Sequence, residues 1–332
     1  MSSIFIVENG VIVGINGGNV VVTQNGKEIR KIPKDTVDGI LFFGQSQMTT
    51  QCMKFCLDMG IRVSFFDQNG RFHGYLMSTY STSAKRLRKQ VSLSENQTYS
   101  LEISRKIVTA KIHNQIVMLR RISNKENVVI KDNLFHMLNA KKKVLGAKSI
   151  PQIMGYEGYA SRCYFDTISE VFGPEWKFNG RNKRPPQDPV NSLLSFGYSL
   201  LTQEMHGEIE NRGLTGYVGF LHEDTEKHPS LSSDLIEEWR PVIVDSVVIM
   251  ALRKGMFSKD DFQYSQGGCF LTNTSRKKFL KMLEDRMNEK TKYLGYIDKS
   301  ITFRQGLWHQ AEKMALSIEA CDSSIYEPVQ IR

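Results

Sequence analysis

The 332-residue chain contains no apolar run that approaches the ~20 residues of a membrane-spanning helix. Its first residues, MSSIFIVENG, lack the basic start and long apolar core of a signal peptide. These two absences lead us to expect a cytoplasmic protein with no membrane segment. No G-x-x-x-x-G-K-[S/T] sequence occurs either, which argues against a P-loop nucleotide hydrolase.

Cysteine is scarce, with five residues and therefore an odd number. Cys52 and Cys56 are four residues apart on a predicted helix, but no second pair completes a zinc site. We expect reduced and mostly buried thiols, and neither a disulfide framework nor a zinc centre.

Acidic residues are too few to balance the basic ones, which leaves a formal net charge of +9. Such an excess favours a polyanionic partner, and DNA or RNA is the usual one. Any single basic cluster is more often a solvated helix face, but several together indicate a broad phosphate-contacting surface. The clusters are Lys85, Arg86, Arg88 and Lys89; Lys141, Lys142, Lys143 and Lys148; Arg181, Lys183 and Arg184; and Arg276, Lys277, Lys278 and Lys281.

Residues 1–77 show the short alternating patterns of β-strands. Asn25-Gly26 separates two of them and is the two-residue signal for a type I′ hairpin. A single helix, about Thr49–Met59, interrupts the strands and ends at Gly60. We expect a small sandwich whose sheet edges serve dimer contacts, because this region contains no catalytic constellation. The predicted strands are 3–7, 11–15, 20–24, 27–32, 39–43, 62–67 and 71–77.

The composition turns small and polar at Ser78–Ser83, and a helical period follows. We therefore predict an α+β protein: a small β-rich dimerisation domain at 1–77, a linker at 78–84 and a larger all-α catalytic domain at 85–332. The tail at Tyr326–Pro328 is expected to be loosely ordered. The predicted helices are 95–122, 133–144, 158–172, 189–208, 235–253, 275–294 and 301–320.

The stretch GFLHEDTEKHPSLSSDLIEEWR, residues 219–240, carries the strongest chemical signal. His222 precedes a polar loop, and Asp234, Glu237 and Glu238 then fall on one face of a predicted helix. A histidine brought to such a face is a plausible site for a divalent metal. The alternative is an ordinary amphipathic helix with a solvated acidic face and an incidental histidine.

A second acid, Glu157, lies in GYEGYA between two glycines and two tyrosines. Small neighbours allow another backbone or a substrate to approach closely. The alternative is a helix start at which Glu157 only caps. Downstream, a proline-rich loop, RPPQDP, enters an apolar helix at Asp188 or Pro189, as helix-start rules predict.

The three patches follow one another in the order GYEGYAS, then RPPxDPVNSLLSFGYxLL, then GFLH with DLIEEWRP. In this order the chain resembles, along its whole length, the CRISPR-associated integrase family, the "Cas one" endonucleases of spacer acquisition. The resemblance implies a metal centre for Mn²⁺ or Mg²⁺ with Glu157, His222 and Glu237 as catalytic ligands. It leaves Asp234 as a nearby acid that supports the site, with the choice between Asp234 and Glu237 for the third ligand open.

The same resemblance implies the reaction and the partners. A DNA 3′-OH would attack a phosphodiester and insert foreign fragments into a CRISPR array. The protein would act as a homodimer with DNA and a small ferredoxin-like "Cas two" companion. A nuclease of branched repair intermediates and a non-catalytic DNA-binding scaffold are the alternatives. The candidate DNA contacts are Lys85, Arg86, Arg88, Lys89, Arg181, Lys183, Arg184 and Tyr198.

Overall fold

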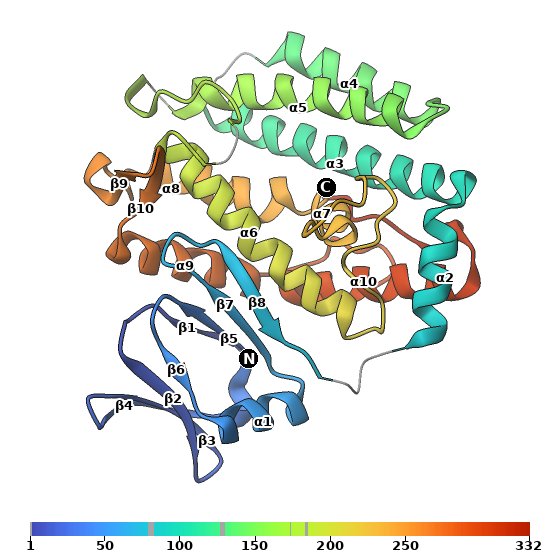
Figure 1. Ribbon diagram of the computed structural model, residues 1–332. Coiled ribbons are helices and arrows are strands. Elements are labelled where there is room, and N and C mark those ends of the chain that lie inside the picture. The colour runs from blue at the N-terminus through green and yellow to red at the C-terminus, as the bar shows by residue number, and fades with distance from the viewer. Residues whose placement is uncertain (1, 79–82, 127–129, 173, 183–184) are drawn as a thin grey trace. The chain divides into compact units, whose positions relative to one another are not determined.

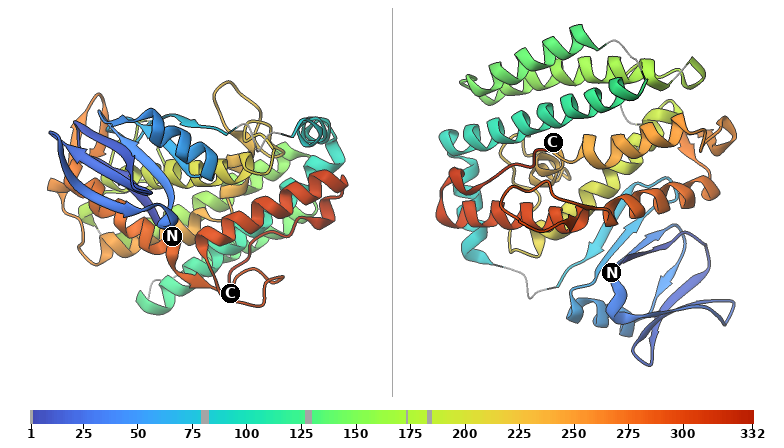
Figure 2. Two further views of the ribbon diagram at one scale, coloured as in Figure 1. Left: turned by 90° about the horizontal axis from the view of Figure 1, so that it is seen from below. Right: turned by 180° about the vertical axis from the view of Figure 1, so that it is seen from behind.

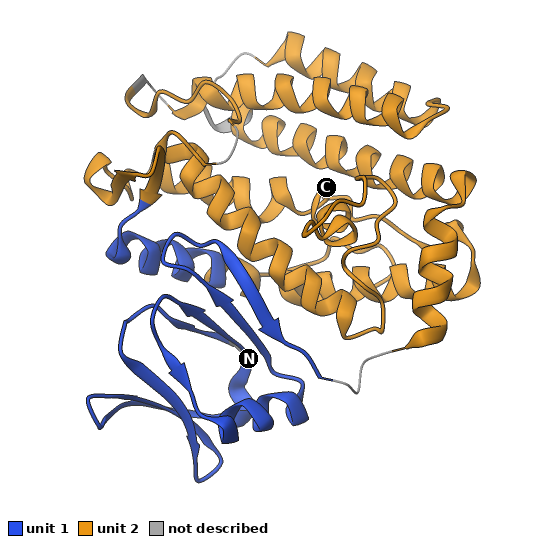
Figure 3. Ribbon diagram, in the orientation of Figure 1, with its two compact units in different colours: residues 1–80, 271–284 blue, residues 81–270, 285–332 orange. Residues whose placement is uncertain are grey.

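The computed structural model describes residues 2–78, 83–126, 130–172, 174–182 and 185–332. The chain forms two compact units (Figure 3). Unit 1 comprises residues 1–80 and 271–284, and unit 2 comprises 81–270 and 285–332. The sequence had assigned 271–284 to the helical domain. The structure places this segment in unit 1, where Lys277 lies 2.5 Å from Glu8 and the N–H of Ser3 donates to Glu284.

Unit 1 holds two four-stranded sheets (Figure 1). In the first sheet, β1 and β7 run parallel to β5 on either side of it, and β8 pairs antiparallel with β7. Its order is β1 (Ser2–Ile6), β5 (Val37–Phe43), β7 (Arg62–Phe66) and β8 (Phe72–Leu76). The second has the order β4 (Lys27–Pro33), β3 (Asn19–Gln24), β2 (Val11–Asn16) and β6 (Gln47–Met48).

Local signals set the turns of unit 1. Asn25 and Gly26 both have positive φ, 52° and 74°, as a type I′ turn requires, and Gln24 pairs with Lys27 across the hairpin. The predicted hairpin is therefore confirmed. Helix α1 (Thr50–Met59) begins where the Thr49 side chain accepts a hydrogen bond from the backbone, and it ends at a left-handed Gly60.

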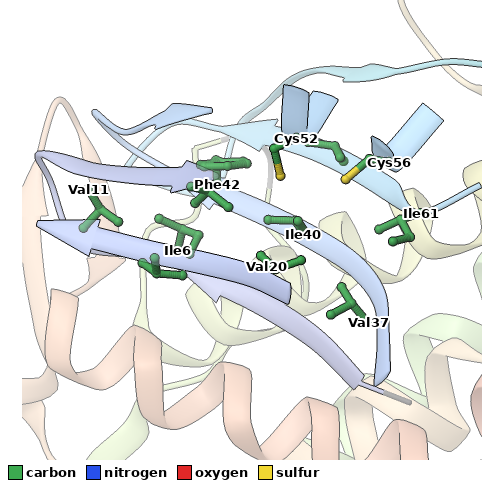
Figure 4. Packing of buried hydrophobic residues seen from close by; sticks show 12 residues of the cluster. Ile6, Val11, Val20, Val37, Ile40, Phe42, Cys52, Cys56 and Ile61 are labelled. Atoms are coloured by element: carbon green, nitrogen blue, oxygen red, sulfur yellow. The ribbon is translucent and has the colours of Figure 1, made fainter. Parts of the chain in front are cut away.

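The core of unit 1 is an apolar cluster between its strands and α1 (Figure 4). Val20 and Ile40 are fully buried in it, as are Cys52 and Cys56. All five cysteines are free, and Cys321 alone among them is exposed. The expectation of reduced, mostly buried thiols is confirmed.

Unit 2 is largely helical (Figures 1 and 2). Helices α4 and α5 pack against each other and against the long helix α3. The helices are α2 (Ala84–Ser94), α3 (Gln97–Glu126), α4 (Lys131–Leu145), α5 (Ile150–Phe172), α6 (Pro189–Glu210), α7 (Ser230–Ile236), α8 (Ser246–Arg253) and α10 (Phe303–Ala320), and α9 (Asn273–Asn288) begins in unit 1 and ends in unit 2.

Two predicted helices differ from the observed ones. Helix α5 begins at Ile150, so Glu157 lies inside a helix and does not cap one. The single helix expected at 235–253 is divided into α7, a π-helical turn at Pro241–Asp245, and α8. Proline lacks the N–H that a continuous helix needs, which explains a break at this point.

Unit 2 is also not purely helical. It contains a hairpin of β9 (Phe262–Ser265) and β10 (Gly268–Leu271), and a short ladder of β11 (Lys290–Thr291) and β12 (Ile301–Thr302). These strands have two to four residues each, too few for a clear alternating pattern. None of the described helices combines the length and the apolar composition that a membrane span requires.

Candidate metal centre

The turn that presents His222 is built around one carboxylate. Asp234, on α7, is fully buried. Its Oδ2 accepts hydrogen bonds from the N–H groups of Phe220 and Leu221 at 2.7 and 3.0 Å, and its Oδ1 accepts from the N–H of His222 at 3.1 Å. Three consecutive N–H groups are thus satisfied by a single side chain, which fixes the backbone at His222.

Close packing of this turn on α7 requires glycine at two positions. A Cβ at Gly219 would lie 2.8 Å from Oδ2 of Asp234, and one at Gly216 would lie 2.1 Å from Nδ1 of His206. Neither distance is compatible with a larger residue. The glycines of the GYVGFLH segment therefore allow the turn to reach the Asp234 carboxylate.

The His222 ring is oriented by the same acid. Its Nδ1 lies 2.7 Å from Oδ1 of Asp234. A hydrogen bond there leaves Nε2 as the ring nitrogen that faces a metal or substrate. Burial opposes protonation, but Asp234 and then Glu237 outweigh it, so the pKa of His222 is raised above its ordinary value.

Glu157 and Glu237 meet at one buried ammonium. Lys111, on α3, is only 7% exposed. Its Nζ contacts Oε1 of Glu157, on α5, and lies 2.5 Å from Oε2 of Glu237, just after α7. Ser161, one turn after Glu157, donates a further hydrogen bond of 2.8 Å to the same Oε1. Two carboxylates from separate helical segments therefore share a single cation.

The surroundings keep Glu237 ionised. Burial alone would raise its pKa, but Arg240, Lys111 and His222 together lower the pKa of Glu237 to about 2. Arg240 Nη1 lies 2.9 Å from Oε1 of Glu237, the oxygen that Lys111 does not contact. Burial likewise opposes the charge on Lys111, yet the Glu157 and Glu237 carboxylates raise its pKa. The centre is a buried set of mutually compensated charges.

These residues fit a divalent cation by the chemistry of their donors. Two carboxylates already share one positive charge, and the His222 imidazole, bound to Asp234 through Nδ1, keeps Nε2 available as a ligand. Carboxylate and imidazole ligands suit Mn²⁺, and carboxylates suit Mg²⁺. In the described part of the chain, however, no three His, Cys, Asp or Glu side chains are gathered closely enough to form a ready ligand cluster. Lys111 stands between the two glutamates.

Asn114, one turn after Lys111 on α3, secures the backbone beside Glu237. Its Nδ2 donates to the carbonyl of Glu238 at 2.8 Å and to that of Val329 at 2.9 Å. Its Oδ1 accepts from the N–H of Ile331 at 3.0 Å. One amide side chain thus links α3, the ligand segment and residues near 330.

Glu238 reaches the same tail with its side chain. It accepts hydrogen bonds from the hydroxyl of Tyr326 and from the N–H of Val329, both at 2.5 Å. Burial raises the pKa of Glu238 to about 8, so this carboxyl is largely protonated at neutral pH. The alternative interpretation of this stretch as a solvated acidic face does not hold, because Asp234, Glu237 and Glu238 are all buried. The predicted loose tail was also wrong, because Tyr326 is fully buried.

Tyr198 packs near the centre with its hydroxyl already engaged. The hydroxyl donates to Asp245 at 2.5 Å, and Tyr164 donates to the other oxygen of the same carboxylate at 3.0 Å. The guanidinium groups of Arg181 and Arg240 lie 5.2 and 4.9 Å from the centroid of the Tyr198 ring. Tyr198 therefore contacts two cations, and one of them, Arg240, also pairs with Glu237.

The remaining predicted DNA contacts lie on α2 and in the loop before α6. Lys85 and Arg88 are exposed. Arg86 pairs with Glu319 at 2.9 Å, and Lys89 donates to the Glu319 carbonyl. These two side chains thus make contacts within unit 2.

Arg181 is exposed, and it donates to Asn191 Oδ1 at 2.6 Å. Asn191 also accepts a hydrogen bond from the backbone N–H of Asn182. The loop before α6 is thus tied to the first turn of that helix. Lys183 and Arg184 lie outside the described residues.

Sequence reasoning missed Lys111 and Arg240. A signal for Lys111 was present, because it falls four residues after Ile107 and three after Val108, within the apolar stripe predicted for this helix. A lysine in that stripe is buried only when it is paired. Arg240 directly follows Trp239 and gave no comparable pattern.

Comparison with known proteins identifies the family. The sequence model described as "CRISPR associated protein Cas1" matches residues 4–285. The chain is 30% identical to the CRISPR-associated endonuclease Cas1 of Mycobacterium tuberculosis over 91% of this chain and 90% of that protein. It is 31% identical to a CRISPR-associated endonuclease Cas1 of Thermus thermophilus over 99% of this chain and 97% of that protein.

Solved structures share the fold. A Cas1 protein from Thermotoga maritima superposes with a TM-score of 0.82 at 23% identity, covering 96% of this chain and 97% of that one. A casposase bound to its integration product gives 0.84 at 24% identity, covering 99% and 93%. On the family match and the relatives of 30% identity and more, this chain belongs to the Cas1 family of CRISPR-associated proteins.

Proposed function

We propose that this protein is a metal-dependent DNA endonuclease and integrase that inserts foreign DNA fragments into a CRISPR array. The observation that carries the proposal is the convergence of Glu157 and Glu237 on one buried cation, with His222 oriented by Asp234 three residues before Glu237. The endonuclease names of the relatives and the integration product bound by the similar casposase support the same assignment.

Glu157, Glu237 and Nε2 of His222 would hold Mn²⁺ or Mg²⁺. When bound, such an ion polarises a phosphoryl group and makes a water or a DNA 3′-OH a stronger nucleophile. The protein side chains prepare this centre. Asp234 fixes the orientation of His222, and Arg240 keeps Glu237 ionised so that it is available as a ligand.

Access for DNA is supported by the surface near Glu157. A Cβ at Gly155 or Gly158 would meet no atom within 4 Å, so α5 is open on both sides of the acid. The net charge of +9 and exposed cations such as Lys85 and Arg88 favour phosphate contacts. We assign affinity to these contacts and chemistry to the buried centre.

The partners in this proposal are a second copy of the chain, through residues 1–77, and a small ferredoxin-like companion. A Cas1 chain with the same fold occurs in a Cas6-RT-Cas1–Cas2 complex, with a TM-score of 0.83. That chain is longer, since this protein covers 36% of it. The exposed Ile12 and Ile29 on the sheets of unit 1 suit a contact with another copy.

The test separates chemistry from affinity. We expect His222→Ala, Glu157→Gln and Glu237→Gln each to abolish joining of free 3′ ends into a repeat-bearing plasmid, at least about a thousandfold in rate. DNA affinity should be unchanged or slightly higher, because the phosphate contacts remain. Joining is measured with Mn²⁺ or Mg²⁺ and the companion protein, and binding by fluorescence anisotropy.

Glu226→Gln is the matched control, because Glu226 is an exposed carboxylate in the loop after His222. It should join DNA at the wild-type rate. If His222→Ala joined DNA at the wild-type rate, the metal mechanism would be disproved and a non-catalytic DNA-binding scaffold would be favoured. Cleavage of branched DNA without joining, in the wild-type protein with its companion, would instead indicate a repair nuclease.

A further inference from the structure

Lys111 is an unusual occupant of a protein interior. Its side chain is 9% exposed, and its ammonium contacts one oxygen of Glu157 and one of Glu237. These are the two acidic ligands of the proposed centre. Moving an ammonium from water into a protein interior is costly unless it is closely paired. The position is therefore determined by the two carboxylates.

The two carboxylates are in turn stabilised by the Lys111 ammonium. Glu237 is 3% exposed, and two carboxylates sharing a buried site repel each other. Arg240 neutralises Glu237 from its other oxygen, Oε1, at 2.9 Å. Lys111 alone bridges both acids among the described ion pairs.

We infer that Lys111 is an internal counter-ion that occupies the cation position of the metal-free centre and is displaced when the metal binds. The inference rests on the proposed function, because it takes Glu157 and Glu237 to be ligands. In this arrangement the lysine holds the acids together before the metal arrives. It also competes with the metal, since one pair of oxygens serves both cations.

This competition predicts the direction in which metal affinity changes when the Lys111 ammonium is removed. If Lys111 and the metal exclude each other, removing the ammonium strengthens metal binding. If the lysine only supports the shape of the centre while the metal is bound, removing it weakens metal binding. The two roles therefore predict opposite changes in the dissociation constant.

The experiment titrates Mn²⁺ into the full-length protein and follows free Mn²⁺ by electron paramagnetic resonance. We expect Lys111→Met to lower the Mn²⁺ dissociation constant about tenfold or more relative to wild type. Lys142→Met is the matched control, because it removes the same charge from an exposed position on α4. It should change the constant by less than about twofold, since exposed distant charges are screened. An unchanged or raised constant for Lys111→Met overturns the inference.

Two further readings keep the test decisive if Lys111→Met is unstable without metal. Saturating Mn²⁺ should raise the Tm of Lys111→Met by more than it raises that of wild type, because metal then supplies the missing cation. Lys111→Arg keeps a cation that can bridge both acids, so it should bind Mn²⁺ no more tightly than wild type. An equal or smaller rise in Tm, or tighter binding by Lys111→Arg, contradicts the inference.

Failure of the proposed function has a different signature. If wild type binds no Mn²⁺, or if Glu157→Gln binds it as well as wild type, the ligand assignment itself is wrong. If wild type binds Mn²⁺, Glu157→Gln loses it, and Lys111→Met shows no gain, only the role of Lys111 is wrong.

Discussion

The buried cluster of unit 1 consists of aliphatic and aromatic side chains and two thiols, from Ile6 to Val63. The interior of unit 2 around α7 is different, because it buries Asp234, Glu237, Glu238 and Asp245 among its apolar residues. The first interior is stabilised by burial of apolar area, which is not directional. The second depends on particular hydrogen bonds and ion pairs, each of which has one geometry.

This difference bears on where a protein can hold buried functional groups. Buried charge is costly unless every group is paired, so a folded protein that retains it must satisfy each one. In unit 2 the pairing also positions the candidate ligands. In unit 1 the apolar cluster from Ile6 to Val63 contains no charged side chain. The comparison predicts that the two interiors respond differently to mutation.

The largest effect is expected from Asp234→Ala. It leaves the N–H groups of Phe220, Leu221 and His222, and Nδ1 of His222, without their acceptor. Each orphaned buried donor costs about 1–3 kcal/mol, so the free energy of unfolding should fall by roughly 5 kcal/mol. Chemical denaturation followed by circular dichroism measures this change.

Asp224→Ala is the control for that substitution. Asp224 is exposed and accepts a backbone hydrogen bond in the same turn, from the N–H of Gly219 at 3.1 Å. Its loss should cost about 1 kcal/mol. Equal losses of unfolding free energy in the two variants would show that neither the burial of Asp234 nor the number of hydrogen bonds it accepts determines its contribution to stability. The proposed contrast between the two interiors would then be weakened.

Phe42→Ala tests the apolar interior of unit 1. Phe42 is 2% exposed and stacks on Phe65 at 5.4 Å. Removing its ring should cost about 3–4 kcal/mol and, by loosening the sheets, weaken the proposed homodimer. Mn²⁺ affinity should stay at the wild-type value, because all candidate ligands are in unit 2. Light scattering measures the dimer, and Mn²⁺ titration measures the metal affinity. If the destabilised variant still formed the dimer, the hypothesis that residues 1–77 make the dimer contact would be contradicted.

The smallest effect is a pH dependence of stability. Burial raises the pKa of Asp245 to about 6 from an ordinary value of 3.8. The folded state then binds more protons than the unfolded state between these two values, so the contribution of Asp245 is full below about pH 4 and declines as pH rises through about 6. The wild type should lose up to about 3 kcal/mol relative to Asp245→Asn across this window. Urea titrations that gave the same difference in unfolding free energy between wild type and Asp245→Asn at pH 4 and at pH 7 would disprove it.

Much of the fold was predictable because its signals are local. Asn25-Gly26 specified a hairpin, and Asp188 capped α6 with a hydrogen bond of 2.8 Å to the N–H of Asn191. The segment carrying His222, Asp234 and Glu237 was recognised by its motif. The motif also favoured a supporting role for Asp234, and in the structure Asp234 orients His222. The ligand assignment itself remains a prediction.

The parts that were missed depend on distant contacts. Lys111 meets Glu157 46 positions away, and no short sequence window contains both. The burial of Glu238 was not predictable either, because the tail that covers it, at Tyr326 and Val329, lies about 90 residues further along the chain. Periodicity describes one element at a time, so it cannot show which face another segment will cover.

The link between Asn114 and Ile331 has a consequence for how the protein is made. The two residues are 217 positions apart, and the backbone of Glu238 shares the same amide. During synthesis, Asn114 and Glu238 leave the ribosome long before Ile331, so the Asn114 side chain lacks its Ile331 partner during that time. Closing so long a loop is also slow. The hydrogen bonds that secure the segment beside Glu237 are therefore completed only after translation has delivered Ile331, so the proposed metal centre is finished late in synthesis.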